Sequence, residues 1–476
     1  MNKLRELLRK IGPIRKIGVV GMGYVGIPSA ALFAENFDFV WGLQRGSRSS
    51  GYKIEMLNRG LCPLKGEEPG LEELIQKVRT EGKFECTSDF SKIKEVDAVT
   101  LAIQTPFKDS VKLEPDFSAL EQGLRQVGKY LQKGMLVVLE STVTPGTTGG
   151  MAAGILREAS GLEAGRDFAL AHAPERVMVG RLIRNIQEHD RIVGGINKES
   201  TERAIELYSP VLTKGEIIAM DATAAEMTKT GENTLRDLQI AAVNELALYC
   251  EAMEVNIYDV RTGIDSLRGD GITRAVLYPG AGVGGHCLTK DTYHLERGVR
   301  LAGTMPDYPP DAESLYTLAR KINDFMPVHM YNLTSEGLSR LGKRIEHSKI
   351  AILGWAFINN SDDTRNTPAE RYYKMLKKEG ALISVHDPYV AKSNSVRISQ
   401  DMNECLKGAA AVAIFTGHRQ YLGLKPGMIK KLTGVQHPVI VDGRNVIDPD
   451  DFIGKGFIYK GIGRGDKNSH DISARA

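Results

Sequence analysis

The chain has 476 residues, a length that predicts two or three domains with ample core. Its formal net charge of +3 is close to balance, and its 42% hydrophobic and 25% charged residues are ordinary for a globular protein. This composition argues against nucleic acid or a membrane as a partner, and no apolar run is long enough to span a bilayer.

Five cysteines are scattered along the chain without a CxxC pair, at positions 62, 86, 250, 287 and 405. This spacing argues against a disulfide framework and against a metal site, and it predicts a reducing, cytoplasmic compartment. Residues 1–11 alternate charge with leucine at helical spacing, which predicts a short amphipathic helix instead of a signal peptide.

The first domain begins with a predicted strand, a glycine loop and a helix. Residues 15–20 are rich in β-formers, and Gly21, Gly23 and Gly26 follow with G-x-G-x-x-G spacing before the helical residues 27–34. Glycines at these positions permit a tight turn and the close approach of a pyrophosphate, which the helix N-terminus attracts. We therefore predict a dinucleotide site here in preference to an ordinary glycine turn.

Gln44 ends the second predicted strand, residues 37–43. An acidic residue normally stands at this position and binds the ribose hydroxyls of NAD. The amide of Gln44 can still hydrogen-bond a hydroxyl, whereas Arg45 and Arg48, without a carboxylate beside them, would also tolerate the 2′-phosphate of NADP. The sequence thus favours NAD as the cofactor and leaves NADP open.

Four further strands are predicted, each separated from the next by a helical segment, at residues 98–103, 135–140, 168–171 and 191–195. This alternation predicts a parallel, doubly wound α/β sheet, whose ligands bind beyond the carboxyl ends of the strands. Polar clusters stand at these ends, at residues 104–106, 141–143 and 172–177. Each cluster alone is as consistent with a structural cap as with a site.

A long helix is predicted over residues 223–254, which are rich in Ala, Glu, Leu and Met and contain no proline. Lys229, Asn233 and Arg236 follow at i, i+4 and i+7 and so project from one face. Because apolar residues cover much of the remaining circumference, we expect this polar face to line a site or an interface. A second helix is expected from residue 311 to about 323, broken by Pro327 and resuming to 341.

Cys287 lies in the glycine-rich stretch 280–291, preceded by His286 and followed by Lys290 and Asp291. Cationic neighbours favour the thiolate, which is the nucleophilic form, and Asp291 could orient or deprotonate water. The glycines would let a substrate approach the backbone closely. Taken alone, the stretch is as consistent with a surface turn that carries an incidental thiol.

A second Rossmann-like unit without a G-x-G-x-x-G loop is predicted near the C-terminus, from strands at 348–357, 382–388, 411–415 and 439–442 and a helix at 368–379. A polar, glycine-rich tail is expected after Tyr459. We expect three domains: a dinucleotide-binding domain over 1–208, a central helical domain with Cys287 over 209–325, and the second Rossmann-like domain over 326–476.

Six motifs, in this order along nearly the whole chain, resemble the UDP-glucose/GDP-mannose dehydrogenase family. They are Gly-Met-Gly-Tyr-Val-Gly at 21–26, Glu-Ser-Thr-Val-Thr-Pro-Gly-Thr-Thr at 140–148, Ala-Pro-Glu-Arg-Val at 173–177, Lys229 with Glu232 and Asn233, Gly-Gly-His-Cys at 284–287, and Asp-Asp-Thr-Arg-Asn-Thr-Pro at 362–368. The resemblance implies two Rossmann-like doubly wound domains joined by a central helical domain. It also implies a C-terminal domain that binds a UDP-sugar, and a homodimer or larger homo-oligomer formed through the long helix.

The resemblance implies a four-electron oxidation of the sugar C6 alcohol to a carboxylate, in which Cys287 forms a thiohemiacetal and then a thioester. Asp291 assists the water that hydrolyses the thioester, Lys229 and Asn233 stabilise the oxyanions, and water held by Thr142 and Glu175 accepts the hydroxyl proton. The implied cofactor positions add Tyr24, Val25, Thr105 and Thr142 to Gly21, Gly23, Gly26, Gln44 and Arg48. The implied substrate positions are Arg176, Val177, Lys229, Asn233, Arg236, Gly282, His286 and Arg365.

Within the family, Pro-Glu-Arg-Val and Gly-Gly-His-Cys are most similar to the branch that oxidises UDP-N-acetyl-mannosamine, with UDP-N-acetyl-glucosamine and UDP-glucose as alternatives. The chain has Ile358 where the family commonly has a lysine that contacts the diphosphate, and Val179 where some relatives have a second glutamate. A non-catalytic nucleotide-sugar sensor would not need Cys287, and a one-step NADP-dependent dehydrogenase would leave Cys287 without a task.

Overall fold

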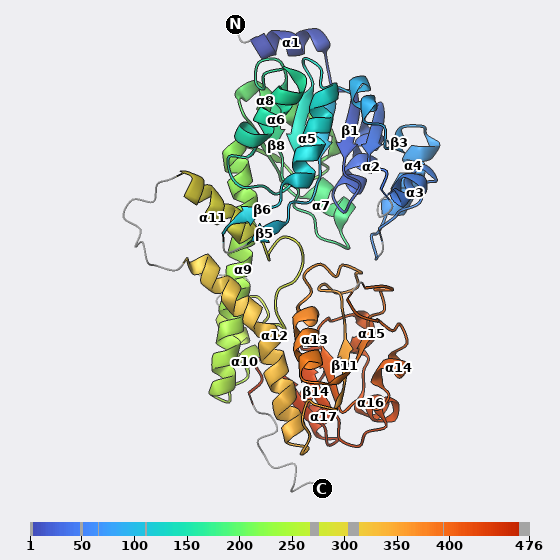
Figure 1. The fold of residues 1–476 in the computed structure, drawn as a ribbon, viewed down its shortest axis with the longest axis vertical. Helices are drawn as coiled ribbons and strands as arrows, with labels where there is room; N and C mark the ends of the chain where they lie inside the picture. The colour runs from blue at the N-terminus through green and yellow to red at the C-terminus, as the bar shows by residue number, and fades with distance from the viewer. Residues whose placement is uncertain are drawn as a thin grey trace. The chain divides into compact units, whose positions relative to one another are not determined.

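The computed structural model describes residues 3–47, 51–64, 66–109, 112–266, 276–302, 314–393 and 395–465. The chain forms two compact units, of which the first comprises Met1–Glu232 with Lys290–Asp307 and the second Asn233–Thr289 with Tyr308–Ala476. Helix α9 (Ala222–Ala252), drawn in green in Figure 1, begins in the first unit and continues in the second. It confirms the long helix predicted over residues 223–254.

The first unit is built on an eight-stranded sheet with the order β10-β9-β8-β7-β4-β1-β2-β3. Its strands are β1 (Lys16–Val20), β2 (Phe39–Leu43), β3 (Phe84–Thr87), β4 (Ala98–Leu101), β7 (Leu136–Leu139), β8 (Ala169–His172), β9 (Arg191–Gly195) and β10 (Ile217–Asp221). The pairs from β3 to β8 are parallel, as predicted, but β9 runs antiparallel to β8 and parallel to β10. Helix α7 (Leu182–Glu188), between β8 and β9, spans only about 10 Å and is too short to return the chain across the sheet.

Helices cover both faces of this sheet. Alternate residues of the central strands enter two separate cores, so that Val138 and Ala171 pack on one face and Val137 and Leu170 on the other. Burial on both faces explains why these strands are continuous apolar runs. The helices are α1 (Lys3–Ile11), α2 (Gly26–Asn36), α3 (Tyr52–Asn58), α4 (Leu71–Thr80), α5 (Ser118–Tyr130), α6 (Ala153–Ser160), α7, α8 (Lys198–Tyr208) and α11 (Asp291–Ala302).

Short elements complete the first unit. They are the hairpin of β5 (Phe107–Asp109) and β6 (Glu114–Pro115), the π-helix η2 (Thr148–Ala152), and the 3₁₀ helices η1 (Phe90–Glu95) and η3 (Ser209–Val211). Helix α1 confirms the predicted amphipathic helix, and it packs on the unit through the buried side chain of Leu4. An ion pair of 3.1 Å between Lys3 Nζ and Asp167 Oδ1 fixes its start.

The second unit contains a five-stranded sheet with the order β12-β11-β13-β14-β15, all parallel. Its strands are β11 (Lys349–Leu353), β12 (Leu382–His386), β13 (Ala411–Ile414), β14 (Val439–Asp442) and β15 (Ile458–Gly461). Its helices are α10 (Ile257–Asp265), α12 (Leu315–Ser339), α13 (Pro368–Lys378), α14 (Met402–Leu406), α15 (Arg419–Leu422), α16 (Pro426–Thr433) and α17 (Pro449–Ile453), together with most of α9. The predicted second Rossmann-like fold is therefore confirmed.

Two local predictions for the second unit are wrong. Helix α12 is continuous through Pro327, because one missing backbone hydrogen bond is tolerated where packing holds the turns on either side. The expected tail after Tyr459 instead continues as β15 to Gly461, and the Gly463 carbonyl accepts a 2.7 Å hydrogen bond from the Ile257 N–H. Residues 311–313, where α12 was expected to begin, and 466–476 lie outside the described residues.

Within the ranges given above, the structure has no helix whose length and apolar character would suffice to cross a membrane.

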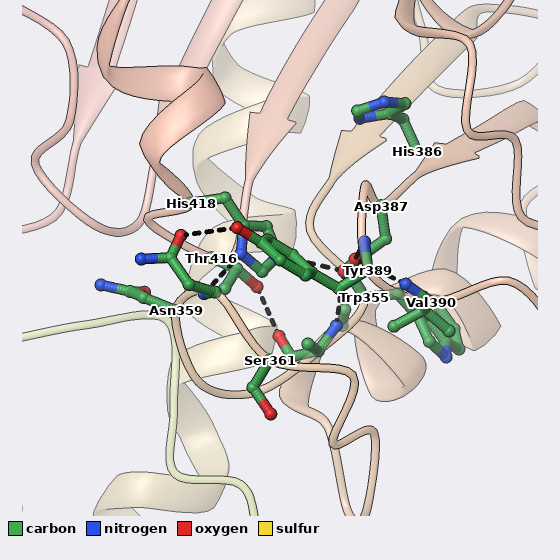
Figure 2. Close-up of polar contacts among 12 residues, drawn as sticks. Trp355, Asn359, Ser361, His386, Asp387, Tyr389, Val390, Thr416 and His418 are labelled. Carbon is green, nitrogen blue, oxygen red and sulfur yellow. Dashed lines mark hydrogen bonds and ion pairs between the residues drawn. The ribbon is translucent and has the colours of Figure 1, made fainter. Parts of the chain in front are cut away.

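A buried carboxylate fixes the turn that follows β11. Figure 2 shows Asp387, whose Oδ2 accepts hydrogen bonds from the N–H groups of Trp355 at 2.7 Å and Ala356 at 2.8 Å. His418 Nδ1 accepts from the Asn360 N–H at 2.8 Å, so the proton lies on Nε2, which donates to Asp387 Oδ2 at 3.2 Å. Although burial alone would raise the pKa of Asp387, the interaction with His418 and the hydrogen bonds from backbone N–H groups together hold it below its ordinary value.

Replacing Asp387 with asparagine should lower the free energy of unfolding of the second Rossmann-like domain by about 2–4 kcal/mol, because an amide N–H₂ would face backbone donors. A carboxyl group with a depressed pKa stabilises the fold above about pH 4, and this stabilisation is lost as the pH falls below that value. The variant lacks the carboxyl group and should therefore lose this acid dependence. Urea unfolding followed by Trp355 fluorescence in a Trp41→Phe background measures both effects.

The control is Asp401→Asn, which changes an exposed carboxylate that caps α14 with one 2.8 Å hydrogen bond to the Asn403 N–H. Asparagine caps helices nearly as well as aspartate, so this change should cost less than about 0.5 kcal/mol. Equal losses in the two variants would contradict the role given to Asp387.

Candidate functional site

The glycine loop stands between β1 and α2, as predicted for a dinucleotide site. Gly21 has φ +98°, and a Cβ there would lie 2.6 Å from the Ala102 carbonyl oxygen. A Cβ on Gly26 would lie 1.9 Å from the Gly21 carbonyl oxygen, whereas no heavy atom of the described residues lies within 4 Å of one on Gly23. Gly21 and Gly26 thus serve the turn, and Gly23 leaves room for a bound pyrophosphate.

Gln44 hydrogen-bonds the backbone of this loop. Its Oε1 accepts a 2.9 Å hydrogen bond from the Met22 N–H, while Lys53 Nζ donates to the Met22 carbonyl at 2.7 Å. The Gln44 amide therefore stands in the usual place of the acidic residue and retains its N–H₂ group as a donor. Arg48, also predicted to contact the cofactor, lies outside the described residues. Tyr24 and Val25, in the same loop, are half-buried.

The carboxyl ends of β4 and β7 meet the start of α11. Thr105 Oγ1 donates to the Thr142 carbonyl at 2.6 Å, so these two predicted cofactor residues are brought together. His294 joins the same strand ends, with its Nδ1 3.1 Å from Thr144 Oγ1 and its Nε2 3.4 Å from the Thr105 carbonyl. Lys290 Nζ lies 3.5 Å from Thr105 Oγ1.

Asp291 is fully buried at the first turn of α11. Lys290 Nζ lies 2.8 Å from its Oδ1. Burial alone would raise the pKa of Asp291, but the charge and hydrogen bond of Lys290, together with the charges of His294 and Lys229, outweigh it and keep the pKa below the ordinary value. Asp291 is therefore a carboxylate at neutral pH, as a group that activates water must be.

Glu175 and Arg176 follow β8. Glu175 is buried, and its Oε1 accepts a 2.7 Å hydrogen bond from the Arg176 N–H, while Arg191 of β9 forms an ion pair with its Oε2. Arg176 Nε lies 2.9 Å from Glu232 Oε2 on α9, so this predicted substrate residue is paired within the first unit. Val177 packs against the core of the unit.

Helix α9 is fixed to the loop that follows β7. Glu226 accepts hydrogen bonds from the Gly146 N–H at 2.5 Å and from the Thr148 N–H at 2.7 Å. One turn further along α9, Lys229 is buried, and one turn beyond it so is Asn233. Because α9 is helical over these residues, Lys229 and Asn233 at i and i+4 share a face, whereas Arg236, expected on the same face, is exposed.

The loop that carries Cys287 packs within the second unit. A Cβ on Gly284 would lie 2.5 Å from Phe357 Cβ, and one on Gly285, whose φ is +88°, would lie 2.8 Å from the Phe357 ring. The Gly285 N–H donates to the Arg365 carbonyl at 2.8 Å. Because only glycine fits against Phe357, the loop is held in one shape that leaves Cys287 exposed.

The remaining predicted substrate residues lie on or near this loop. Gly282 has φ +120°, and a Cβ there would meet Pro327 and Pro368. His286 is half-buried, and Arg365 pairs with Asp363 through a 2.8 Å hydrogen bond from Nε to Oδ1. Within the second unit, Gly282, His286 and Cys287 lie on one loop, and Arg365 contacts that loop. Within the first unit, Thr105, Thr142 and Asp291 lie close together.

Sequence reasoning assigned no role to Glu226, His294 or Arg191. Glu226 and His294 each lie one helical turn from a residue that was assigned, Lys229 and Asp291, and this spacing is a signal that could have found them. Arg191 gave no such signal, because it begins an ordinary-looking strand.

A dinucleotide loop at the carboxyl edge of a doubly wound sheet, with an exposed cysteine elsewhere in the chain, defines the class of dinucleotide-dependent oxidoreductases with a thiol available for covalent chemistry. The chain belongs to the UDP-glucose/GDP-mannose dehydrogenase family: residues 15–212 match its NAD binding domain, 223–324 its central domain and 351–449 its UDP binding domain. The predicted family, dehydrogenase class and NAD cofactor are confirmed.

Several relatives match nearly the whole chain. The UDP-N-acetyl-D-mannosamine dehydrogenase of Pyrococcus horikoshii is 35% identical over 451 residues, which are 95% of this chain and 100% of that protein. The enzyme of the same name from Campylobacter jejuni is 33% identical and covers 86% of this chain and 96% of its own. The crystal structure of NDP-N-acetyl-D-galactosaminuronic acid dehydrogenase from Methanosarcina mazei Go1 is 67% identical, with a TM-score of 0.88 over 99% of this chain and 100% of that chain.

Replacing Gly23 with alanine should leave the melting temperature within about 2 °C of the original but weaken NADH binding at least about tenfold, because the methyl group would occupy the space beside the turn. Gly26→Ala should instead destabilise the unit by about 1–3 kcal/mol through its clash with the Gly21 carbonyl. Thermal unfolding and NADH fluorescence titration measure the two quantities.

Gly154→Ala is the control, because Gly154 lies within α6 and a Cβ there meets no described atom within 4 Å. Alanine in a helix should be neutral or stabilising by about 0.5–1 kcal/mol. Unchanged NADH affinity in Gly23→Ala would show that the pyrophosphate does not bind at this loop.

Proposed function

We propose that the chain oxidises the C6 alcohol of UDP-N-acetyl-mannosamine to the carboxylate in two successive two-electron steps. The observation that carries this proposal is Cys287, an exposed thiol on a loop that Phe357 holds in one conformation, in a chain that matches all three domains of the family. Curated relatives of 35% and 33% identity that carry this activity in their names support the choice of sugar.

The first unit supplies the proton chemistry in this proposal. NAD, when bound, accepts hydride from C6. Thr142 and Glu175 hold the water that takes the hydroxyl proton, and Glu175 suits this task because two N–H donors fix its carboxylate. Lys229 and Asn233, one turn apart on α9, stabilise the negative oxygen on C6 at each tetrahedral stage.

Cys287 supplies the covalent step. Its thiolate adds to the C6 aldehyde to form a thiohemiacetal, and the second oxidation leaves the sugar bound as a thioester. Water then attacks the thioester carbonyl, Asp291 accepts the water proton, and the thiolate leaves with the C–S electron pair. Asp291 lies four positions after Cys287, which limits the distance between their Cα atoms to about 14 Å.

The nucleotide end of the substrate is assigned to Arg176, Val177, Arg236, Gly282, His286 and Arg365. Guanidinium groups suit a diphosphate because they donate two parallel hydrogen bonds to phosphate oxygens. Since Ile358 cannot donate to a phosphate, Arg365 is proposed to carry a larger share of this contact.

A galacto-configured UDP-N-acetyl-hexosamine is the second candidate substrate. The observation that favours it is the 67% identity to the Methanosarcina mazei dehydrogenase, whose name refers to N-acetyl-D-galactosaminuronic acid. The two sugars differ in configuration at C2 and C4, away from the C6 group, so the same covalent mechanism serves either one.

We also propose a cytoplasmic homodimer, with domains over 1–208, 209–325 and 326–476. Helix α9 exposes large apolar side chains that a partner would cover, and Met227, Leu235 and Tyr249 have exposed fractions of 47%, 53% and 58%. A single-chain mass in solution, measured by light scattering, would contradict the dimer.

Purified protein with NAD should yield two reduced cofactors per UDP-N-acetyl-mannosamine consumed, measured by absorbance and by mass spectrometry of the uronate. UDP-N-acetyl-galactosamine, UDP-N-acetyl-glucosamine and UDP-glucose complete the panel, each with NAD and with NADP. Higher kcat/KM for the galacto sugar would replace the first substrate by the second. One reduced cofactor per sugar would remove the proposed role of Cys287.

Replacing Cys287 with serine should lower steady formation of the acid at least about a thousandfold, because a serine alkoxide is not available at neutral pH to form the acyl intermediate. NADH binding should be unchanged, since the dinucleotide loop belongs to the first unit. Cys62→Ser is the control: Cys62 is half-buried and burial raises the pKa of its thiol, so its loss should leave turnover intact. Turnover by Cys287→Ser within tenfold of the original would exclude the thioester.

A further inference from the structure

Arg191 is a buried arginine that contacts Glu175. It begins β9 with an exposed fraction of 4%, and its Nη1 forms an ion pair with Glu175 Oε2. Its Nη2 donates to the Ala173 carbonyl at 2.9 Å and to Glu140 Oε1 at 3.1 Å. One guanidinium therefore joins the ends of β7 and β8 to the carboxylate that carries the proposed proton chemistry.

A second layer holds Arg191 in place. Tyr208, at the end of α8, donates its hydroxyl to Glu140 Oε1 at 2.8 Å, and its ring lies 4.3 Å from the Arg191 guanidinium carbon. Glu140 Oε1 thus accepts from two partners, and the ring covers the face of the guanidinium. Both terminal nitrogens of Arg191 are thus engaged and its face is covered, while its Nε has no hydrogen-bond partner among the described residues. These contacts restrain the orientation of Arg191 and, through the ion pair, that of Glu175.

Arg191 is the cation that Glu140 and Glu175 both contact directly. Burial raises the pKa of Glu140 to about 7, with Arg191 opposing and Glu175 adding to the rise. Burial lowers the pKa of His172 to about 3, helped by the charges of Arg191 and Lys229, so His172 is neutral here. Of the titratable and charged groups, Arg191, Glu140 and the neighbouring Arg176 interact with Glu175 directly. The groups one step further out are Tyr208, which contacts Glu140, His172, which is influenced by Arg191 and Lys229, and Glu232, which pairs with Arg176.

We propose that Arg191 is the positioning residue for Glu175, and that Glu140, which shares this arginine with Glu175, sets the pH range over which the cluster supports turnover. The inference rests on the proposed function of Glu175 as the group that holds the proton-accepting water. Arg191 acts through Glu175 and does not touch the substrate. The physical basis is that a shared cation favours the ionised form of whichever carboxylate it contacts most closely.

Two substitutions in the cluster should move the pH profile in opposite directions. Arg191→Lys keeps the charge but cannot reach both carboxylates, so the negative charge of the cluster is less well compensated. We expect kcat to fall about tenfold and the acid limb of the activity to move up by about one pH unit. Glu140→Gln removes the competing charge, so the acid limb should move down by about half a unit. The measurements are kcat and KM for sugar and NAD from about pH 5 to 10, with KM values expected within about twofold.

The matched control is Arg203→Lys, another buried arginine of the first unit, which bonds the Gly12 carbonyl at 3.0 Å and pairs with Glu206. It should lower the melting temperature by an amount similar to Arg191→Lys but leave the pH profile unchanged. Shifts of the same sign in Arg191→Lys and Glu140→Gln, or no shift in either, would overturn the inference even if both variants are less active.

Glu175→Gln separates this inference from the proposed function. If that variant loses turnover while both cluster variants keep the original acid limb, Arg191 has only a structural role and the function proposed for Glu175 stands. If Glu175→Gln turns over at the original rate, the proton role of Glu175 is wrong and the inference about Arg191 falls with it. With the inference correct, Arg191→Lys should cost no further activity in the Glu175→Gln background.

Discussion

Parallel pairing of β1, β4, β7 and β8 is the constraint on which the dinucleotide half of the site depends. Each of these strands ends at the same edge of the sheet, so the segments that follow them emerge side by side. Gly23, Thr105, Thr142 and Glu175 follow four different strands and are separated by up to 152 residues in sequence, yet all belong to this edge. The sheet topology therefore brings together residues that are far apart in the sequence. Contacts of His294 with Thr144 and of Lys290 with Thr105 attach the start of α11 to the same edge.

The elements that the sequence predicted well carry strong local signals. The strand, glycine loop and helix at 16–36 and the long helix α9 were predictable because glycine spacing and the absence of proline act within a few residues. The direction of β9 and the continuity of α12 through Pro327 were not, because a strand direction depends on where the preceding connection returns and a helix can absorb one lost hydrogen bond when tertiary contacts hold it. Strand β15 was missed for a similar reason, since four residues before a glycine-rich segment form a strand only through pairing with β14.

The candidate site shows the same division. Its motif residues were found because glycine, cysteine and lysine stand at recognisable spacings, but the reason for the glycines is tertiary. Gly284 and Gly285 must lack side chains because Phe357, which follows β11, occupies the space beside them. The position of Phe357 depends in its turn on Asp387, which hydrogen-bonds the backbone of the two residues before it. A chain of contacts thus leads from a buried carboxylate after β12 to the loop of Cys287 within the second unit. Nothing in the sequence around residue 387 signals that connection, because Trp355 and Ala356, the partners in the turn after β11, lie more than thirty residues away.

The two buried carboxylate clusters differ in how completely their charges are compensated. Asp387 accepts from four backbone N–H groups and from His418, and its pKa is held below the ordinary value even though burial opposes this. Glu140 has an Oε2 atom with no hydrogen-bond partner among the described residues, shares one guanidinium with Glu175, and has a pKa of about 7. Desolvating such a group costs several kcal/mol, and apolar replacements of buried ion clusters are often as stable or more so. Stability alone therefore accounts for the cluster around Asp387 but not for the one around Glu140. An unbalanced carboxylate that titrates near neutral pH is instead expected where proton transfer takes place, and this one is joined to Glu175 through a single arginine.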